Sequence, residues 1–241
     1  MPTRAEYLQV IEPILEQHST SSDQAWDGIY RLLLWYDGGY PHIVEANELK
    51  KKSWGERARL IEAELAKAFG CPAHEVRYQV GKLYQHPLFR RMQIQNPLGI
   101  GFTLSVALLL RKFCSAHYQF LMEEAIGETV FIGLRDAPRR ASDLVAVRGG
   151  TEEAIVSAKW SIRHDRLKDL FDECSYFRAV RPKLRFLVVT DEYMPARLEK
   201  LLENRCIDEV FHVRRDFLLQ VNPGSRVEAI CDLSALFPVF R

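Results

Sequence analysis

Cysteine is scarce in this chain, and no two cysteines stand close together. The sequence has five, at Cys71, Cys114, Cys174, Cys206 and Cys231. This scatter lacks the Cys-x-x-Cys spacing of a structural zinc site, and an odd number argues against a disulfide framework. We expect buried free thiols instead.

Long apolar runs are also missing. Even the run Val106–Leu110 is far too short to cross a bilayer. The first residues, 1–11, lack the apolar centre of a secretory leader. With 47% hydrophobic and 27% charged residues among 241, the composition predicts a globular, cytoplasmic protein with no membrane partner.

Acidic residues are absent from one long segment, 76–122, although the net charge of the chain is only +1. The segment carries basic side chains alone: Arg77, Lys82, Arg90, Arg91, Arg111 and Lys112. Local neutralisation of phosphates governs affinity for nucleic acid, so this pattern is typical of a face that contacts DNA. The alternative is a partly buried helical segment that happens to lack acids.

The first half of the chain has helical periodicity. Helices are predicted over 7–17, over 26–34 behind a cap at Ser22 or Asp23, over 54–69 and over 73–84. The last two are joined tightly enough to form a DNA-reading helix-turn-helix, or an ordinary antiparallel pair. A loop over 96–101 and a long apolar helix over 102–125 follow.

The second half changes to short β-branched or alternating runs. Strands are predicted over 129–134, 142–147, 154–160, 184–190 and 210–213, with helices over 165–180 and 196–203 between the later ones. The order predicts an α/β fold with a mixed β-sheet flanked by helices and a helical N-terminal part. Residues 1–95 would pack on a core of residues 96–241, or the whole of 1–241 would form one domain.

A hairpin is predicted around Gly149 and Gly150. If residues 149–151 form its loop, Asp143 lies opposite Ser157. The period-2 alternation of a strand then places Ser157 and Lys159 on the same face as Asp143. A slip of one residue would remove this alignment.

Carboxylates and a lysine placed in this way suit a metal-dependent phosphodiesterase. Glu173 stands in the next predicted helix, which could bring it back over the hairpin. Asp143, Glu173 and the backbone carbonyl of Ala158 would supply the hard oxygen ligands that Mg²⁺ prefers. Lys159 would orient or deprotonate the attacking water and offset charge on the phosphorus.

Each of these residues also has an ordinary interpretation. Asp143 could be a turn residue at the end of a strand, and Glu173 could belong to a solvated helix face. Lys159 is harder to explain in this way, because strands in the centre of a sheet rarely carry a lysine without a partner.

A compact charged cluster, Arg163-x-Asp165-Arg166, follows the lysine directly. Arginine contacts guanine O6 and N7 in the major groove, and a carboxylate accepts a hydrogen bond from cytosine N4. The cluster is therefore typical of a reader of consecutive G·C pairs. Alternatively, Asp165 is a helix N-cap between two solvated arginines.

Together, Asp143, the Ser157-x-Lys159 pair and Glu173 resemble the PD-(D/E)xK nuclease fold. More narrowly, they look like type II restriction endonucleases that recognise CCGG, CCNGG or CCWGG sites. In that branch a serine such as Ser157 replaces the usual glutamate, and the acid moves to the next helix, as Glu173 would. The resemblance implies a restriction-endonuclease-like fold.

The same resemblance implies a restriction-modification activity: Mg²⁺-dependent cleavage of double-stranded DNA at a palindromic site that contains CC/GG, leaving 5′-phosphate and 3′-hydroxyl ends. Arg163, Asp165 and Arg166 would read the CC/GG half-site. A two-fold symmetric target calls for a homodimer, or a tetramer as in some relatives.

Two other functions compete with this hypothesis. One is a repair or mobile-element nuclease of the same fold that reads DNA shape. The other is a non-catalytic DNA-binding protein that uses the predicted helix-turn-helix within residues 54–84.

Overall fold

A computed structural model of the chain describes residues 4–36, 66, 70, 72, 75, 97–122, 142–162 and 164–241. In chain order the elements are α1 Arg4–Gln17, α2 Ser22–Tyr36, α7 Pro97–Phe113, β1 Tyr118–Met122, β2 Leu144–Arg148, β3 Thr151–Lys159, α8 His164–Val180, β4 Arg185–Thr190, α9 Pro195–Glu203, β5 Glu209–His212, α10 Arg215–Val221, η2 Arg226–Ala229, β6 Cys231–Asp232 and η3 Leu233–Phe240.

Within the described part of the chain, the strands form one six-stranded sheet in the order β1-β2-β3-β4-β5-β6. The first three strands pair antiparallel, and β3 to β6 pair parallel. Parallel neighbours need crossovers, which the segments containing α8, α9 and α10 provide. The predicted α/β fold with a mixed, helix-flanked sheet is therefore observed.

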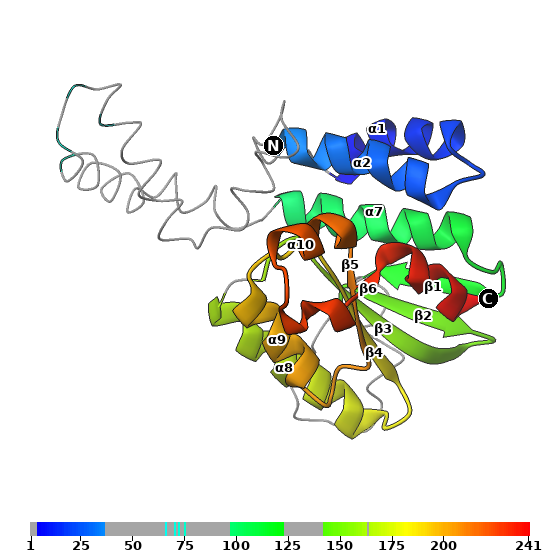
Figure 1. The fold of residues 1–241 in the computed structure, drawn as a ribbon. Coiled ribbons are helices and arrows are strands. Elements are labelled where there is room, and N and C mark those ends of the chain that lie inside the picture. The colour runs from blue at the N-terminus through cyan, green and yellow to red at the C-terminus, as the bar shows by residue number, and fades with distance from the viewer. Residues whose placement is uncertain are drawn as a thin grey trace.

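Apolar side chains cover both faces of this sheet. Along β3, Val156 and Ala158 face a core shared with α1, α2, α7 and η3, whereas Ile155 faces a second core shared with α8, α9 and α10. Figure 1 shows α7 between the sheet and the pair formed by α1 and α2, with α8 and α9 on the opposite side. A strand buried on both faces is held rigidly, which suits the placement of a site at its end.

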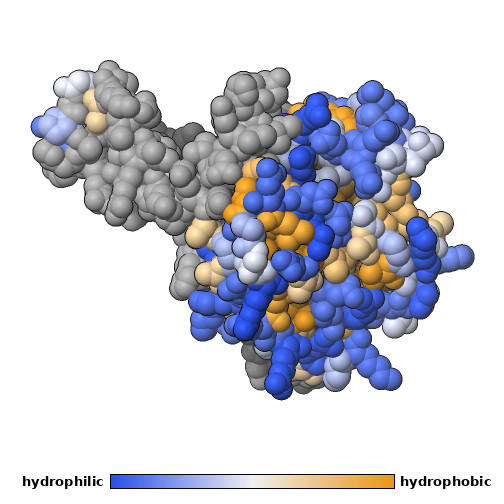
Figure 2. All heavy atoms as spheres, viewed as in Figure 1, coloured by the Kyte–Doolittle hydropathy of each residue, from blue (hydrophilic) through white to orange (hydrophobic). Residues whose placement is uncertain are grey.

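In the part of the chain that the structure describes, no helix is long and apolar enough to cross a membrane. Figure 2 shows a largely hydrophilic surface on the described residues, with hydrophobic atoms gathered in smaller patches. Such scattered patches are ordinary on a folded protein.

The strands predicted over 142–147, 154–160, 184–190 and 210–213 are confirmed with slightly shifted bounds. The helices predicted over 7–17, 165–180 and 196–203 are confirmed as well. The second helix begins at Ser22, but Ser21 rather than Ser22 or Asp23 accepts the capping hydrogen bond, from the Gln24 N–H at 3.3 Å. The predicted helices over 54–69 and 73–84 lie almost wholly outside the described residues, as do residues 76–96 of the acid-free segment, the strand over 129–134 and a boundary near residue 95.

The predicted loop over 96–101 is wrong from residue 97 onward, and the helix predicted over 102–125 is confirmed only as far as Phe113. Helix α7 already begins at Pro97, where the fixed φ of proline suits a first turn, and ends at Phe113. Residues Tyr118–Met122 form β1 instead, because alternate aromatic side chains face the core: Phe120 is buried, and Phe120 and Tyr118 both pack on Phe240. Pairing with β2 overrides the helical pattern of this short segment.

Gly101 explains why a glycine stands inside α7. A Cβ atom at this position would overlap the ring of Tyr7, a buried residue of α1. Replacing Gly101 with alanine is expected to lower the free energy of unfolding by about 1–3 kcal/mol, the usual cost of overpacking. Denaturant titration followed by circular dichroism measures this change.

The matched control is Ser175→Ala at an exposed position of α8, which should change stability little. Equal stability of Gly101→Ala and the unmodified chain would contradict the close packing of α1 on α7.

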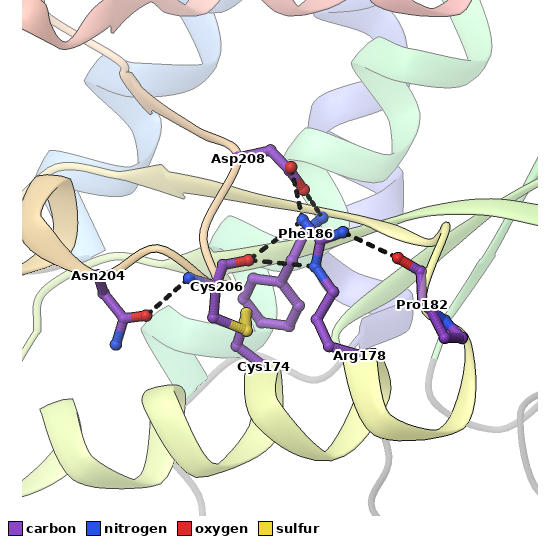
Figure 3. The surroundings of a disulfide bond; sticks show 7 residues. All are labelled: Cys174, Arg178, Pro182, Phe186, Asn204, Cys206 and Asp208. Atoms are coloured by element: carbon purple, nitrogen blue, oxygen red, sulfur yellow. Dashed lines mark hydrogen bonds and ion pairs between the residues drawn. A yellow bond between two sulfur atoms is a disulfide. The ribbon is translucent and has the colours of Figure 1, made fainter.

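The expectation that all cysteines are free thiols is also wrong. Cys174 of α8 and Cys206, in the loop before β5, form a disulfide with a Cα–Cα distance of 6.0 Å. Figure 3 shows the same loop held by Arg178, which donates hydrogen bonds to the Cys206 carbonyl and to Asp208. The pair was invisible in the sequence because 32 residues separate its members and the fold alone brings them together.

Cys206→Ser is expected to lower the free energy of unfolding by about 3 kcal/mol under oxidising conditions, since the cross-link restricts the unfolded chain. Denaturant titrations with and without reductant measure the effect, and reductant should abolish the difference between the two proteins. Cys231→Ser, which changes a cysteine that forms no disulfide, is the control. Identical unfolding of Cys206→Ser and the unmodified chain without reductant would rule out the cross-link.

Candidate active site at the end of strand β3

Three hydrogen-bond donors from the end of β3 converge on one carboxylate oxygen of Asp143. Oδ2 of Asp143 accepts from the Lys159 ammonium at 2.6 Å, from the Ala158 backbone N–H at 2.8 Å and from the Ser157 hydroxyl at 3.2 Å. The structure thus brings together Asp143, Ser157 and Lys159, which the sequence placed on the two strands of the hairpin. Their side chains meet where β2 begins and β3 ends.

Register explains this meeting. Leu144 pairs with Val156, so Asp143, one residue earlier, lies opposite Ser157, as predicted. The loop that led to this prediction was wrong, because Thr151 already belongs to β3 and pairs with Arg148. Only the two glycines form the turn, both with positive φ.

A β-bulge reconciles the shorter turn with the predicted register. Val147 pairs with Glu152, but Ala146 pairs with Ala154, so Glu153 is the extra residue on β3. The side chain of Glu153 accepts hydrogen bonds from Tyr118 at 2.6 Å and Arg148 at 2.7 Å. These contacts lower the pKa of Glu153, chiefly through the Tyr118 hydroxyl and then through Arg148. Because the bulge adds one residue to β3 before Ala154, it sets the face on which Ser157 and Lys159 lie.

Lys159 and Asp143 lie at the margin of the core. The side chains are 33% and 14% exposed, respectively, whereas Ser157 is fully buried. The ion pair with Asp143 holds the lysine in one orientation. About a third of the Lys159 side chain remains in contact with solvent.

Glu173 lies on α8, one residue before the disulfide cysteine Cys174. Its Oε1 atom is buried, so the side chain is not a simple solvated helix face. Among the described residues, the donors to Asp143 Oδ2 are those of β3, and Glu173 comes from a different element, α8.

The proposed DNA-reading residues lie at the start of α8. Arg163 is outside the described residues, and α8 begins at His164, so Asp165 lies in the first helical turn rather than at the N-cap. Arg166 is 68% exposed and pairs with Asp169 at 3.4 Å across one turn. An exposed pair of this kind is weak, which leaves the Arg166 guanidinium available to another partner.

The oxygen atoms around Asp143 fit a hard divalent cation. A residue in a strand directs its N–H and C=O groups toward the same neighbouring strand. Because the Ala158 N–H donates to Asp143, the Ala158 carbonyl is directed toward the same side of the strand. Among the described residues, no group of three or more His, Cys, Asp or Glu side chains could hold a metal ion. Mg²⁺ needs few protein ligands, because it usually keeps several of its waters.

Two acidic residues that the sequence analysis passed over lie close by, after β4. Asp191 and Glu192 are 1% and 2% exposed. Asp191 accepts hydrogen bonds from the Tyr30 hydroxyl, with both oxygens at 3.2 Å. Burial raises the pKa of Tyr30 and of Tyr193, and the Asp191 carboxylate raises both further, so both tyrosines remain neutral hydrogen-bond donors. The sequence did contain a signal for them, because two acidic residues directly follow a buried strand. In a parallel sheet, ligands bind at the carboxyl ends of the strands.

Comparison with known proteins gives only distant structural likenesses. No protein-family model and no curated protein matches the chain. The restriction endonuclease PspGI in complex with substrate DNA is similar at 14% identity and a TM-score of 0.49, covering 100% of this chain and 92% of the other. Metal-depleted Ecl18kI in complex with uncleaved, modified DNA is similar at 14% identity and a TM-score of 0.38, covering 99% and 83%.

Proposed function

We propose that this protein is a type II restriction endonuclease that cleaves double-stranded DNA at a palindromic site containing CC/GG, with Mg²⁺ as cofactor. The observation that carries the proposal is the convergence of Lys159, Ser157 and the Ala158 N–H on Asp143. A charged, solvent-accessible lysine beside a carboxylate at a strand end suits phosphodiester hydrolysis. The Arg163-x-Asp165-Arg166 cluster begins four residues after that lysine in the sequence.

Lys159 is the residue that acts on the reacting atoms. Asp143 holds the ammonium group at 2.6 Å, so the lysine does not have to be ordered when DNA binds. From this position it orients the attacking water and stabilises the negative charge that develops on the phosphate oxygens. Ser157 and the Ala158 N–H fix the orientation of the Asp143 carboxylate.

Asp143, Glu173 and the carbonyl of Ala158 would hold the magnesium ion. When bound, the ion polarises the scissile phosphate and lowers the pKa of a coordinated water. The two carboxylates offset the positive charge of the cation and of Lys159. In-line attack of water would leave 5′-phosphate and 3′-hydroxyl ends.

Arg163 and Arg166 would donate to guanine O6 and N7, and Asp165 would accept from cytosine N4. These contacts read two adjacent G·C pairs on one half-site. A second protomer related by two-fold symmetry would read the other half, so we propose a homodimer, or a tetramer built from such dimers.

Digestion of phage DNA with and without Mg²⁺, followed by sequencing of the fragment ends, tests this function. The expected result is a set of discrete fragments that share one short palindrome with CC/GG, formed only when the metal is present. A smear without a common end sequence would favour a nuclease that reads DNA shape. Intact DNA under all conditions would contradict the proposed activity.

A further inference from the structure

The chain between Lys159 and Arg163 makes a short turn at the end of the sheet. Trp160 packs on Tyr30 and Phe102 in the core on the α7 side, with ring centroids 5.7 and 5.4 Å away. Ile162 is buried in the opposite core, on the α8 side. The turn therefore crosses the end of the sheet with one side chain anchored on each face.

A buried carboxylate holds the backbone of this turn. Oε2 of Glu192 accepts from the Ile162 N–H at 2.9 Å and from the Arg197 guanidinium at 2.9 Å. Oε1 accepts from the N–H groups of Tyr193 and Met194, at 3.1 and 3.0 Å. These two groups precede α9, so the carboxylate also lies at the positive end of a helix. Four donors and 2% exposure fix Glu192 in one position.

The backbone of Glu192 is fixed as well. Its N–H donates to Thr190 Oγ1 at 3.1 Å, and its carbonyl lies 3.0 Å from Nε2 of His212 on β5. Nδ1 of His212 accepts from the Arg214 N–H at 3.0 Å, so the imidazole proton is on Nε2 and donates to Glu192. The backbone of Glu192 is thus hydrogen-bonded to residues of both β4 and β5.

We propose that Glu192 is a positioning residue that fixes the DNA-reading segment, Arg163–Arg166, relative to the cleavage group formed by Asp143 and Lys159. The inference rests on the proposed function. Ile162 directly precedes Arg163 in the chain, so the hydrogen bond of its N–H sets where the reading segment begins. Loss of this bond would leave both groups intact but misaligned, and it would impair the discrimination between DNA sites.

The test compares two variants that remove different hydrogen bonds of the Glu192 carboxylate. Glu192→Gln places an amide where a carboxylate oxygen accepts hydrogen bonds, and it disrupts at least one donor pair. Arg197→Met removes the ion pair but leaves Glu192 its three backbone N–H donors. For each variant we would measure the thermal unfolding midpoint and the ratio of cleavage rates at the preferred site and at sites with one base changed.

We expect Glu192→Gln to lower this ratio about tenfold or more, the effect of losing one hydrogen bond to a charged group. Arg197→Met should lower the unfolding midpoint without changing the ratio. A ratio that falls equally in both variants, or in neither, would overturn the positioning role.

If Glu192→Gln does not fold, the α-hydroxy acid analogue of isoleucine at position 162 replaces it in the test. This ester removes only the N–H donor and keeps the buried charge, and it should lower the ratio to the same extent. An unchanged ratio in the ester protein would overturn the inference. Absence of any cleavage by the unmodified protein would instead remove the proposed function itself.

Discussion

Replacing Lys159 with alanine is expected to lower the rate of DNA cleavage about a thousandfold, the usual effect of losing one preorganised charge or proton-transfer group. DNA binding should persist, because Arg163, Asp165 and Arg166 remain. The fold should persist too, since Asp143 keeps the Ser157 and Ala158 donors. Single-turnover cleavage and gel-shift binding on the same DNA measure the two effects separately.

Lys168→Ala is the matched control. Lys168 stands on α8, is 84% exposed and also pairs with an aspartate, Asp172 at 3.1 Å. Its loss should leave cleavage unchanged. Full activity of Lys159→Ala would remove the catalytic role of the lysine, and equal losses in both variants would point to a general effect of charge on DNA binding.

Arg166→Ala is expected to lower the rate of cleavage at the preferred site about a hundredfold or more. Each arginine contact with guanine contributes about 1–3 kcal/mol of discrimination, and a symmetric dimer loses the contact twice. The exposed pair with Asp169 contributes little to the fold, so stability should not change. Cleavage of a plasmid with one preferred site, and of the same plasmid with one base changed, measures the loss. Arg163→Ala should behave in the same way.

Arg226→Ala controls for the loss of a surface arginine. Arg226 is 77% exposed and pairs with Glu203 at 3.2 Å, far from the start of α8 along the chain. Specific cleavage by Arg166→Ala and Arg163→Ala at the unmodified rate would show that other residues read the DNA.

The strand alternation made the neighbourhood of Asp143 predictable. Period-2 alternation along 154–160 places Ser157 and Lys159 on one face, whatever the rest of the fold does. The register that brings Asp143 to them was reached from a loop one residue too long. The bulge at Glu153 compensated, and no local sequence signal specified it.

Long-range packing accounts for the parts of the fold that were not predicted. Residues 118–122 continue an apolar helical pattern in the sequence, and only pairing with β2 and contact with Phe240 make them a strand. The disulfide between Cys174 and Cys206 likewise depends on the packing of α8 beside the loop before β5. The hydrogen bond between Glu192 and the Ile162 N–H depends on the parallel pairing of β3 with β4, which brings the two residues together.

The most direct test of the central claim is a crystal structure of the protein with its DNA site and Ca²⁺, a cation of the same ligand preference that tolerates looser geometry. We predict one ion about 2.3–2.6 Å from oxygens of Asp143, Glu173 and the Ala158 carbonyl, with Lys159 directed at the scissile phosphate. An ion bound elsewhere, or a Glu173 carboxylate turned away from Asp143 when DNA is in place, would contradict the proposed site.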